Sequence, residues 1–325
     1  MRAVLCRTLG DISSIGVEEV PAPVRASDQV RIAVKAAGVN FPDVLMVEGK
    51  YQVKPQLPFI PGLEVAGEVI DCARDGTQLK PGDRVLAFAR HGGGFASEIV
   101  LPAAIVTPIP DAMDFVAAAA FPVAYGTAHF ALDYRGRLKA GETLLVLGAA
   151  GGVGLAAIEI GKFLGARVIA AAGGAAKGAI CAAHGADAVI DYTTENLRDR
   201  VLALTDGRGV DVVFDPVGGT AFEQSVRCIG WEGRILVVGF ASGDIPKVAA
   251  NMILVKNFSV VGVVFGAHSD RFPDDTRARL GTLLQGYSQG RFKPRIHKVL
   301  PLERAAEALA EITGRRVVGK MVLTT

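Results

Sequence analysis

Cysteine is scarce in this sequence, and the few that occur lie far apart. The 325 residues include four cysteines, at positions 6, 72, 181 and 228, and no two of them form a CxxC pair. Such spacing argues against a disulfide framework and against a cysteine-rich zinc-binding lobe, since both need clustered cysteines. Scattered cysteines are instead typical of a reducing compartment, and we expect a cytoplasmic protein.

An excess of one charge and a long apolar segment are also missing. Lysine and arginine number 35 against 33 aspartates and glutamates, a net charge of +2, and no basic run interleaved with aromatic residues occurs. No apolar run reaches the roughly 18–20 residues of a membrane span. The opening residues, MRAVLCRTLGD, lack the apolar core of a signal peptide. We therefore expect a small-molecule partner, no nucleic acid and no membrane.

The sequence does contain a strand–helix–strand pattern between residues 142 and 177. Apolar residues fill 143–147 and 168–172 without polar alternation, as in strands buried on both faces of a parallel sheet. Between them a helix is expected at 153–164, with Gly165 ending it. The turn into this helix is rich in glycine: Gly148, Gly151, Gly152 and Gly154. The pattern predicts a βαβ unit.

The glycine spacing is that of a dinucleotide-binding turn with one departure, since alanine replaces the first glycine in Ala149-x-Gly151-x-x-Gly154. Gly151 lets backbone N–H groups approach a pyrophosphate, Gly154 allows close helix packing, and the helix N-terminus attracts the anion. Glycine-rich turns are common in any α/β protein. Here strand, glycines, helix and second strand occur together, and the combination favours dinucleotide binding.

The end of the second strand indicates which dinucleotide binds. Proteins that prefer NAD usually carry an acidic residue there, bonded to the ribose 2′-hydroxyl. This chain has no acidic residue between Glu159 and Asp187, but small residues at 170–176 followed by Lys177. An ordinary exposed lysine is the alternative, and it leaves the missing acid unexplained. Because a 2′-phosphate fits this space and can bind Lys177, we expect the cofactor to be NADPH.

The rest of the chain divides into two regions of different type. Residues 1–120 are rich in short β-segments broken by proline and glycine, and Gly67 inside one of them indicates a bulge or tight bend. These segments are 3–5, 16–20, 29–37, 64–70, 84–89 and 98–101. From 142 to 265 strands and helices alternate, which predicts a doubly wound parallel sheet of six strands. Its remaining strands are 188–190, 212–214, 234–238 and 258–264. Helices are expected at 111–120, 123–133, 270–289 and 302–312, and a returning strand at 320–323.

Six stretches carry a resemblance to a known family: AAGVNFPDVLMVEGKY (36–51), LPFIPGLEVAGEV (57–69), LKPGDRVLAF (79–88), FPVAYGTAHFAL (121–132), GAAGGVGLAAIEIGK (148–162) and GKMVL (319–323). As a set they resemble the zinc-free quinone oxidoreductase branch of the medium-chain dehydrogenase/reductase superfamily, the relatives of zeta-crystallin. The resemblance runs essentially end to end. It implies an α/β fold, with a GroES-like β-barrel catalytic domain (1–122 and 266–325) and a Rossmann domain with a doubly wound parallel sheet (123–265).

The resemblance also implies that no metal takes part. Zinc alcohol dehydrogenases hold their catalytic metal with a cysteine where this chain has Asn40 and a histidine where it has Leu63, and Glu64 alone cannot bind zinc. After position 88 the chain reads ARHGGGFASE in place of a four-cysteine lobe, and its histidines show no paired ligand spacing. Hydrogen-bond donors must then polarise the substrate carbonyl.

Site residues follow from the same resemblance. Thr127 is where the family sets a hydroxyl near the nicotinamide, and Asn40 and Tyr51 match polar residues of the substrate cleft. In related enoyl-thioester reductases a tyrosine at the position of Tyr51 is thought to donate a proton. Asp43 is better explained as a loop-stabilising carboxylate. The nucleotide contacts are expected from Ala150, Gly151, Gly152, Val153, Gly173, Lys177, Tyr192, Gly239, Phe240, Ala241, Val264 and Phe265.

The residues by themselves allow plainer roles. Tyr51 is also compatible with an amphipathic loop tyrosine, Asn40 with an asparagine that satisfies turn backbone, and Tyr192 with a strand cap. The resemblance favours a site role for Asn40 and leaves Tyr51 equally balanced between the two roles.

Three functions remain open at this stage. The leading one is NADPH-dependent reduction of quinones by hydride or one-electron transfer. The alternative is reduction of an activated C=C bond in an enone, an alkenal or an enoyl-CoA thioester. A binding or structural role is the third, and the intact pyrophosphate turn argues against it. We also expect a homodimer through the strand at 257–264, whose apolar edge carries no proline and is free to pair with a second copy. The alternative is that a helix from 270–289 covers this edge.

Overall fold

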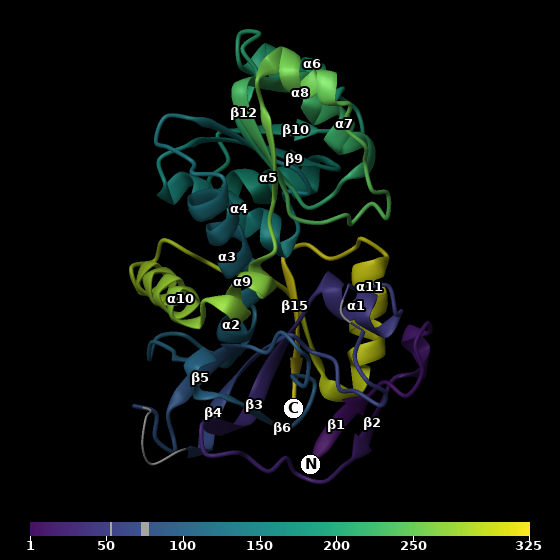
Figure 1. The fold of residues 1–325 in the computed structure, drawn as a ribbon, viewed down its shortest axis with the longest axis vertical. Coiled ribbons are helices and arrows are strands. Elements are labelled where there is room, and N and C mark those ends of the chain that lie inside the picture. Colours follow the sequence, from purple (N-terminus) through teal and green to yellow (C-terminus); the bar gives the residue numbers. More distant parts are fainter. Residues whose placement is uncertain (53, 73–77) are drawn as a thin grey trace. The chain divides into compact units, whose positions relative to one another are not determined.

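The computed structural model describes residues 1–52, 54–72 and 78–325. They form two compact units, which Figure 1 shows as ribbons. We call Met1–Val123 with His268–Thr325 the β-rich unit, and Ala124–Ala267 the parallel-sheet unit.

The β-rich unit is built around one long strand, β3 (Gln29–Val39). The main sheet runs in the order β14-β15-β3-β4-β5-β7, and β6 pairs with β3 off this path. β3 pairs with β15 through its last residues, with β6 through its first, and with β4 along most of its length. The other strands of this sheet are β4 (Glu64–Cys72), β5 (Arg84–Phe88), β6 (Glu98–Pro102), β7 (Val106–Pro108), β14 (Ile296–Pro301) and β15 (Lys320–Thr324). A separate hairpin-like pair is formed by β1 (Arg2–Leu5) and β2 (Gly16–Glu19).

The bend expected at Gly67 is confirmed. Gly67 of β4 pairs with Val34, and the register shifts before the next pair, so one extra residue of β3 bulges out. A side chain at Gly67 would collide with the carbonyl oxygen of Ala33. Only glycine lets the two strands approach this closely.

Three of the expected helical stretches begin or end at other places than the apolar pattern gave. The helix expected at 111–120 is only α2 (Phe115–Ala119), because the Asp114 carboxylate accepts a hydrogen bond from the Ala117 N–H at 2.7 Å and caps the helix there. The stretch 270–289 is broken into α9 (Phe265–Arg271) and α10 (Pro273–Ser288), since Pro273 has no N–H to continue a helix. The last helix is α11 (Ala305–Thr313), after a 3₁₀ turn.

Helix α1 (Phe41–Val47) and strands β7 and β14 were not anticipated. α1 has only seven residues and follows the long strand β3 directly, so no helical period is visible in the sequence.

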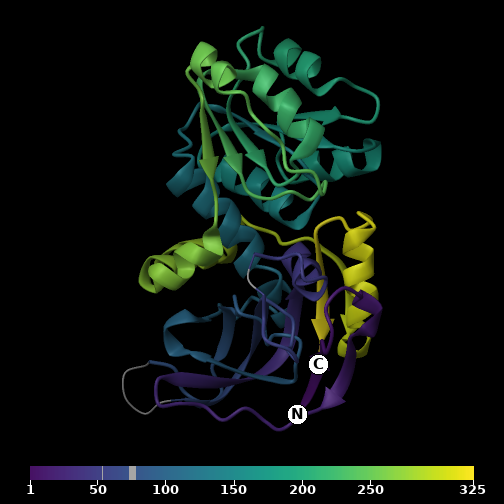
Figure 2. The same ribbon diagram turned by 45° about the vertical axis from the view of Figure 1, so that its right-hand side comes forward.

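The parallel-sheet unit confirms the predicted sheet. Its six strands are all parallel and run in the order β10-β9-β8-β11-β12-β13. Helices flank the sheet, as Figure 2 shows from a second direction. The strands are β8 (Thr143–Val146), β9 (Arg167–Ala172), β10 (Ala188–Asp191), β11 (Val210–Asp215), β12 (Ile229–Val237) and β13 (Ser259–Gly262). The helices are α4 (Gly152–Phe163), α5 (Ala175–Ala183), α6 (Leu197–Leu204), α7 (Gly219–Cys228) and α8 (Ala250–Lys256).

The helical segment that leads into this unit consists of an α-helix followed directly by a π-helix. α3 (Pro122–His129) continues as a π-helix over Phe130–Arg135, which agrees with the helical stretch expected at 123–133. Helix α4 ends as expected: Gly165 follows its C-cap Leu164 with φ of +83°, a conformation that glycine adopts without strain.

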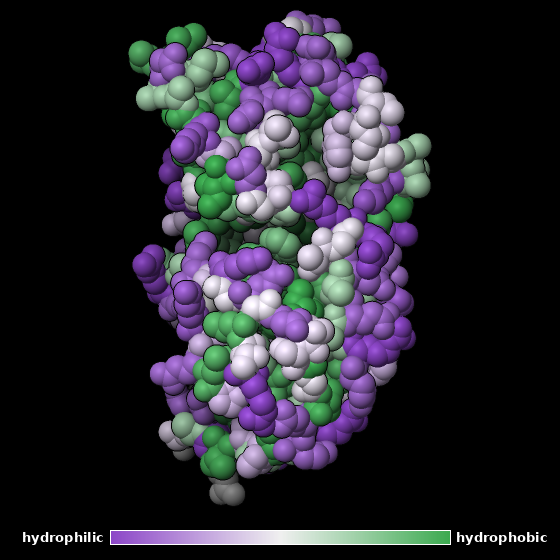
Figure 3. Space-filling model, turned by 90° about the vertical axis from the view of Figure 1, so that its right-hand side faces the viewer, coloured by the Kyte–Doolittle hydropathy of each residue, from purple (hydrophilic) through white to green (hydrophobic). Residues whose placement is uncertain are grey.

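Within the described part of the chain, no helix is both long and apolar enough to cross a membrane. On the face drawn in Figure 3, hydrophobic residues are interspersed with hydrophilic ones.

Candidate functional site

The turn between β8 and α4 forms a cradle of backbone groups. Gly151 is the N-cap of α4, and it carries no side chain that could bond the first N–H groups of the helix. A Cβ atom at Gly154 would lie 2.5 Å from the Gly148 oxygen and 2.7 Å from the Ala149 oxygen, so the helix packs against the turn as closely as backbone allows. Uncapped N–H groups at the start of a twelve-residue helix suit a bound anion. The residues expected here, Ala150, Gly151, Gly152 and Val153, lie together in this cradle.

The turn after β9 brings the next group of expected residues together. Gly174 has φ of +89° and is the N-cap of α5, on which Lys177 lies in the first turn. Tyr192, half exposed, stands over the same turn, since a Cβ atom at Gly173 would lie 3.0 Å from its hydroxyl oxygen. Gly173, Lys177 and Tyr192 therefore surround one short loop.

Asp191, at the end of β10, is a residue of this loop that sequence reasoning missed. One carboxylate oxygen, Oδ1, accepts hydrogen bonds from the Gly174 N–H at 2.9 Å and from the Thr193 hydroxyl at 2.6 Å. These bonds, that from Thr193 first, hold the pKa of Asp191 below its ordinary value. The loop thus carries a negative charge as well as Lys177. The sequence does place Asp191 at the end of a strand. That strand is β10, the third of this unit, whereas an NAD-binding acid is expected at the end of the second strand, β9.

A third loop lies at the ends of β11 and β12. Asp215 is buried, and its Oδ1 accepts the N–H groups of Val217 at 2.8 Å and Gly218 at 2.9 Å. Burial raises the pKa of Asp215. Its other oxygen, Oδ2, has no hydrogen-bond partner among the described residues. The expected segment of Gly239, Phe240 and Ala241 follows β12 here, and the Ala241 N–H donates to the Pro216 oxygen at 3.0 Å.

The last expected pair, Val264 and Phe265, is divided between surface and core. Val264 is 51% exposed, whereas Phe265 is buried. The Phe265 ring packs on Phe130 with centroids 5.9 Å apart, and it covers Gly126 so closely that a Cβ there would lie 2.7 Å from the ring. Phe265 thus contacts helix α3 at the residue next to Thr127.

In the β-rich unit, Asn40 belongs to a buried network of charged groups. Asn40 precedes α1, and its Nδ2 donates to the Glu64 Oε1 at 2.9 Å and to the Gly38 oxygen at 3.3 Å. Its Oδ1 accepts a bond of 2.5 Å from the ammonium of Lys320, which also bonds the Glu64 Oε1 at 2.6 Å. Both amide hydrogens of Asn40 are therefore directed to protein acceptors. Lys320 was not among the expected site residues, although the segment 319–323 carried part of the resemblance.

Asp43 stabilises backbone at this place, as expected. Its carboxylate is fully buried and accepts the N–H groups of Asn40 at 2.8 Å and Gly62 at 3.1 Å. Burial raises the pKa of Asp43 to about 7, against the lowering effect of the Asn40 N–H and of Lys320.

Tyr51 lies after α1, partly buried. Its N–H donates to the Leu45 oxygen at 3.0 Å, which fixes the chain after the helix. Burial raises the pKa of its phenol, and the charge of Arg90 acts in the opposite direction. Arg90 itself is ion-paired with Asp270. Tyr51 therefore keeps its proton at neutral pH.

No group of three or more metal-ligating side chains occurs in residues 1–52, 54–72 and 78–325. The position next to Glu64 is occupied by the Lys320 ammonium.

Two family models match the chain. One describes an alcohol dehydrogenase GroES-like domain and matches residues 26–111; the other describes a zinc-binding dehydrogenase and matches residues 152–280. A quinone oxidoreductase-like protein 2 homolog from Nematostella vectensis is 43% identical over 326 residues, covering 100% of this chain and 89% of that protein. A quinone oxidoreductase from Rattus norvegicus is 34% identical, covering 99% and 97%. Among solved structures, Escherichia coli quinone oxidoreductase complexed with NADPH superposes with a TM-score of 0.94 at 27% identity, covering 100% of both chains.

Proposed function

Because this chain belongs to the zinc-free quinone oxidoreductase branch of the medium-chain dehydrogenase/reductase superfamily, we propose that it is an NADPH-dependent enzyme that reduces quinones. The chain is a medium-chain oxidoreductase with a GroES-like domain and a Rossmann sheet. That its cofactor is NADPH and that its electron acceptor is a quinone is what we propose in addition.

The observation that carries the proposal is the cradle between β8 and α4. Its first N–H groups are not capped by a side chain, and Gly154 excludes anything larger than hydrogen where helix and turn meet. The pyrophosphate would lie on these N–H groups, and the 2′-phosphate beside Lys177 and Tyr192. Asp191 opposes a phosphate there by its charge, but two of its neighbours, Gly174 and Thr193, already neutralise part of that effect through hydrogen bonds. NADPH, when bound, supplies a hydride from its nicotinamide ring.

The residues of the chain supply orientation and a proton. Thr127 stands one helical turn into α3 and is proposed to hold the nicotinamide amide. Tyr51, protonated at neutral pH, is proposed to give its phenolic proton to a reduced substrate. Asn40, whose amide hydrogens are used within the protein, is proposed to shape the substrate site rather than to polarise the acceptor directly.

The state of Tyr51 favours a second candidate function. Reduction of an activated C=C bond leaves a carbanion or enolate that needs a proton, and a phenol that is protonated at neutral pH can supply one. A reduced quinone takes its protons from water and has no such need. The alternative is therefore an NADPH-dependent reductase of enones, alkenals or enoyl-CoA thioesters.

A steady-state screen tests both candidates. NADPH and NADH are each offered with a quinone series, an alkenal series and enoyl-CoA thioesters, before and after prolonged incubation with a chelator. We expect turnover with NADPH on quinones, a weaker rate with NADH, and no loss on chelation. Turnover on alkenals or thioesters alone would favour the second function, and no turnover with any acceptor would contradict both.

We also propose that the enzyme is a homodimer through β13. This strand lies at the edge of the sheet. The Val263 N–H donates to the Val237 oxygen of β12 at 3.0 Å, so by alternation Val260 and Gly262 direct their backbone groups outward. The guanidinium of Arg135 donates to the Gly262 oxygen at 3.0 Å, which agrees with this direction. A second copy paired antiparallel on this edge would satisfy the remaining groups.

A further inference from the structure

The β-rich unit contains a buried ion pair between strands that are far apart in the sequence. Lys320 begins β15 and Glu64 begins β4, and the ammonium lies 2.6 Å from the Glu64 Oε1. Lys320 is 6% exposed and Glu64 is fully buried. Removing two charges from water is unfavourable, and such pairs are often no more stabilising than apolar residues of the same size. Stability alone therefore does not explain why this ion pair is buried.

Apart from the bond between them, the side-chain hydrogen bonds of this pair lead to residues at the start of a helix or directly before it. Lys320 donates to the Val39 oxygen at 3.1 Å and to the Asn40 Oδ1 at 2.5 Å. Val39 is the last residue of β3, and Asn40 is the N-cap of α1. The second carboxylate oxygen of Glu64 accepts the Val123 N–H at 2.8 Å. Val123 is the second residue of α3, where a helix has N–H groups without internal partners. A carboxylate at this place also suits the positive end of the helix.

These two helices lead to the proposed catalytic side chains. Tyr51 follows α1 and is held by the N–H bond to Leu45 in that helix, and Thr127 lies one turn after Val123 in α3. Resting on the proposed function, we infer that the Lys320–Glu64 ion pair positions the starts of α1 and α3, and through them Tyr51 and Thr127. Lys320 and Glu64 are positioning residues, and neither needs to touch the substrate.

The packing around the pair supports a fixed geometry. Glu64 has three donors on two oxygens, from Lys320, Asn40 and Val123. On the neighbouring strand β3, Gly38 lies opposite Glu64. Any side chain at position 38 would collide with the Glu64 carboxylate. Because both of its oxygens are hydrogen-bonded and Gly38 bounds its space, the carboxylate is held in one arrangement.

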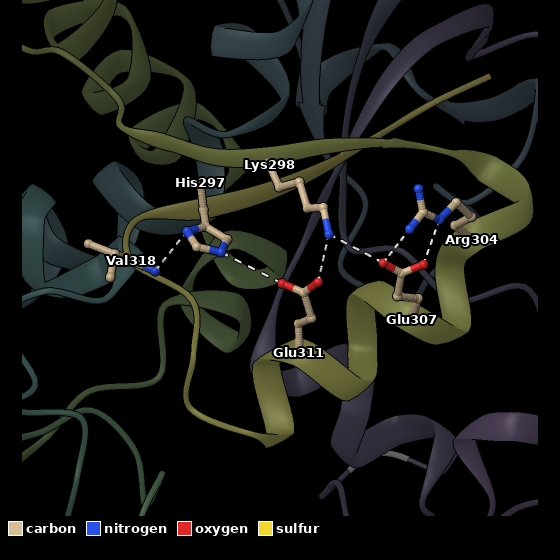
Figure 4. Close-up of polar contacts among 6 residues, drawn as sticks. All are labelled: His297, Lys298, Arg304, Glu307, Glu311 and Val318. Carbon is tan, nitrogen blue, oxygen red and sulfur yellow. Dashed lines mark hydrogen bonds and ion pairs between the residues drawn. The ribbon is translucent and has the colours of Figure 1, made fainter.

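The same unit offers a matched control, drawn in Figure 4. Lys298 of β14 donates to Glu311 at 2.9 Å and to Glu307 at 3.3 Å, both on α11. Lys298 pairs with Met321, the neighbour of Lys320, but it is 40% exposed and bonds no residue of α1 or α3. Lys298→Met removes a lysine ion pair from the adjoining strand and leaves the inferred positioning intact.

The test compares Glu64→Gln with wild type and with Lys298→Met. Glutamine has the same volume as glutamate, but only one of its two terminal atoms, the amide oxygen, can accept hydrogen bonds. If its NH₂ group takes the place of Oε2, that group faces the Val123 N–H, and both are donors. We expect kcat to fall by about 10- to 100-fold, as for a small misplacement of catalytic groups. The Kd for NADPH, measured by calorimetry, should change far less than kcat, because the cradle is untouched and only the contact from Thr127 is disturbed. Lys298→Met keeps the wild-type kcat.

Amide hydrogen exchange gives a readout that needs no acceptor. In Glu64→Gln we expect faster exchange in peptides covering 40–47 and 122–127, and unchanged exchange in peptides covering β14 and α11. Should wild type reduce no acceptor, the proposed function fails, while exchange still decides the positioning of the two helix starts.

Three results would overturn the inference. They are unchanged exchange in the two segments, a folded Glu64→Gln with wild-type kcat, and a loss of kcat that only follows the fraction of folded protein. Where Glu64→Gln does not fold, the double variant Lys320→Met/Glu64→Gln, which leaves no unpaired buried charge, is judged by the same criteria.

Discussion

The two units of this chain hold their proposed functional groups in different ways. In the parallel-sheet unit the cradle consists of backbone N–H groups and glycines within one βαβ segment, and it fails if a side chain is added. In the β-rich unit the arrangement depends on hydrogen bonds among side chains at positions 40, 64 and 320, and we expect it to fail if one is removed. The backbone site is thus formed by residues close together in the sequence, and a larger side chain disturbs it. The side-chain network joins residues far apart in the sequence, and the loss of one partner disturbs it.

The largest effect should come from removing one hydroxyl in the β-rich unit. For Tyr51→Phe we expect turnover on enones or alkenals to fall by about 10²–10⁴, because the proton donor is lost. Turnover on quinones should fall far less. Steady-state kinetics on both acceptor classes with saturating NADPH measures the difference, and equal small losses on every acceptor would reduce Tyr51 to a packing role.

Adding one methyl group should break the parallel-sheet unit's cradle. In Gly154→Ala the new Cβ would lie 2.5 Å from the Gly148 oxygen, so the start of α4 must move away from the turn. Losing two hydrogen bonds to a charged phosphate, each of about 1.5–3 kcal/mol, should weaken NADPH binding by about 100-fold or more. Calorimetry gives the Kd. Gly281→Ala on α10, where no atom lies within 4 Å of the new Cβ, is the control; an unchanged Kd in Gly154→Ala would argue against the cradle.

A side chain of the same unit should matter for one cofactor only. Lys177→Ala removes a charge-assisted contact of about 1.5–3 kcal/mol, and we expect NADPH to bind about 10- to 100-fold more weakly. NADH, which lacks the 2′-phosphate, should bind as before. Titration of the wild type and the variant with each cofactor measures the two affinities. An equal loss of affinity for NADH would show that Lys177 does not bind the 2′-phosphate.

The smallest effect on turnover is expected at the sheet edge. Val260→Pro removes an outward-facing N–H of β13 and leaves the bonds to β12, which come from Val261 and Val263. We expect sedimentation to show a shift from dimer to monomer, with Val260→Thr as the control that keeps the N–H. A wild-type monomer at micromolar concentration would refute the dimer.

The same contrast explains how much the sequence could predict. The six parallel strands, the glycine turn and the end of α4 at Gly165 were predicted because each depends on neighbours in the chain. The family resemblance supplied the GroES-like domain. Asp191 was missed because it is adjacent to Gly174 only once β9 and β10 are paired.

The buried network could not be predicted for a similar reason. Lys320 meets Glu64 across 256 residues, and no local period marks a lysine that will be buried. Helix α1 was missed because seven residues show too little periodicity. The resemblance pointed to Asn40 as a site residue, but only the structure shows that both of its amide hydrogens are already bonded.

The Lys320–Glu64 pair has a consequence for synthesis of the chain. The parallel-sheet unit is continuous, from Ala124 to Ala267, so it leaves the ribosome whole and can fold at once. The β-rich unit combines residues 1–123 with residues 268–325, and β3 lacks its partner β15 until residues 320–324 have been added. Until then the Glu64 carboxylate has no ammonium beside it. The proposed catalytic unit therefore closes last, and a chain cut short before residue 320 contains the whole parallel-sheet unit but an incomplete β-rich unit.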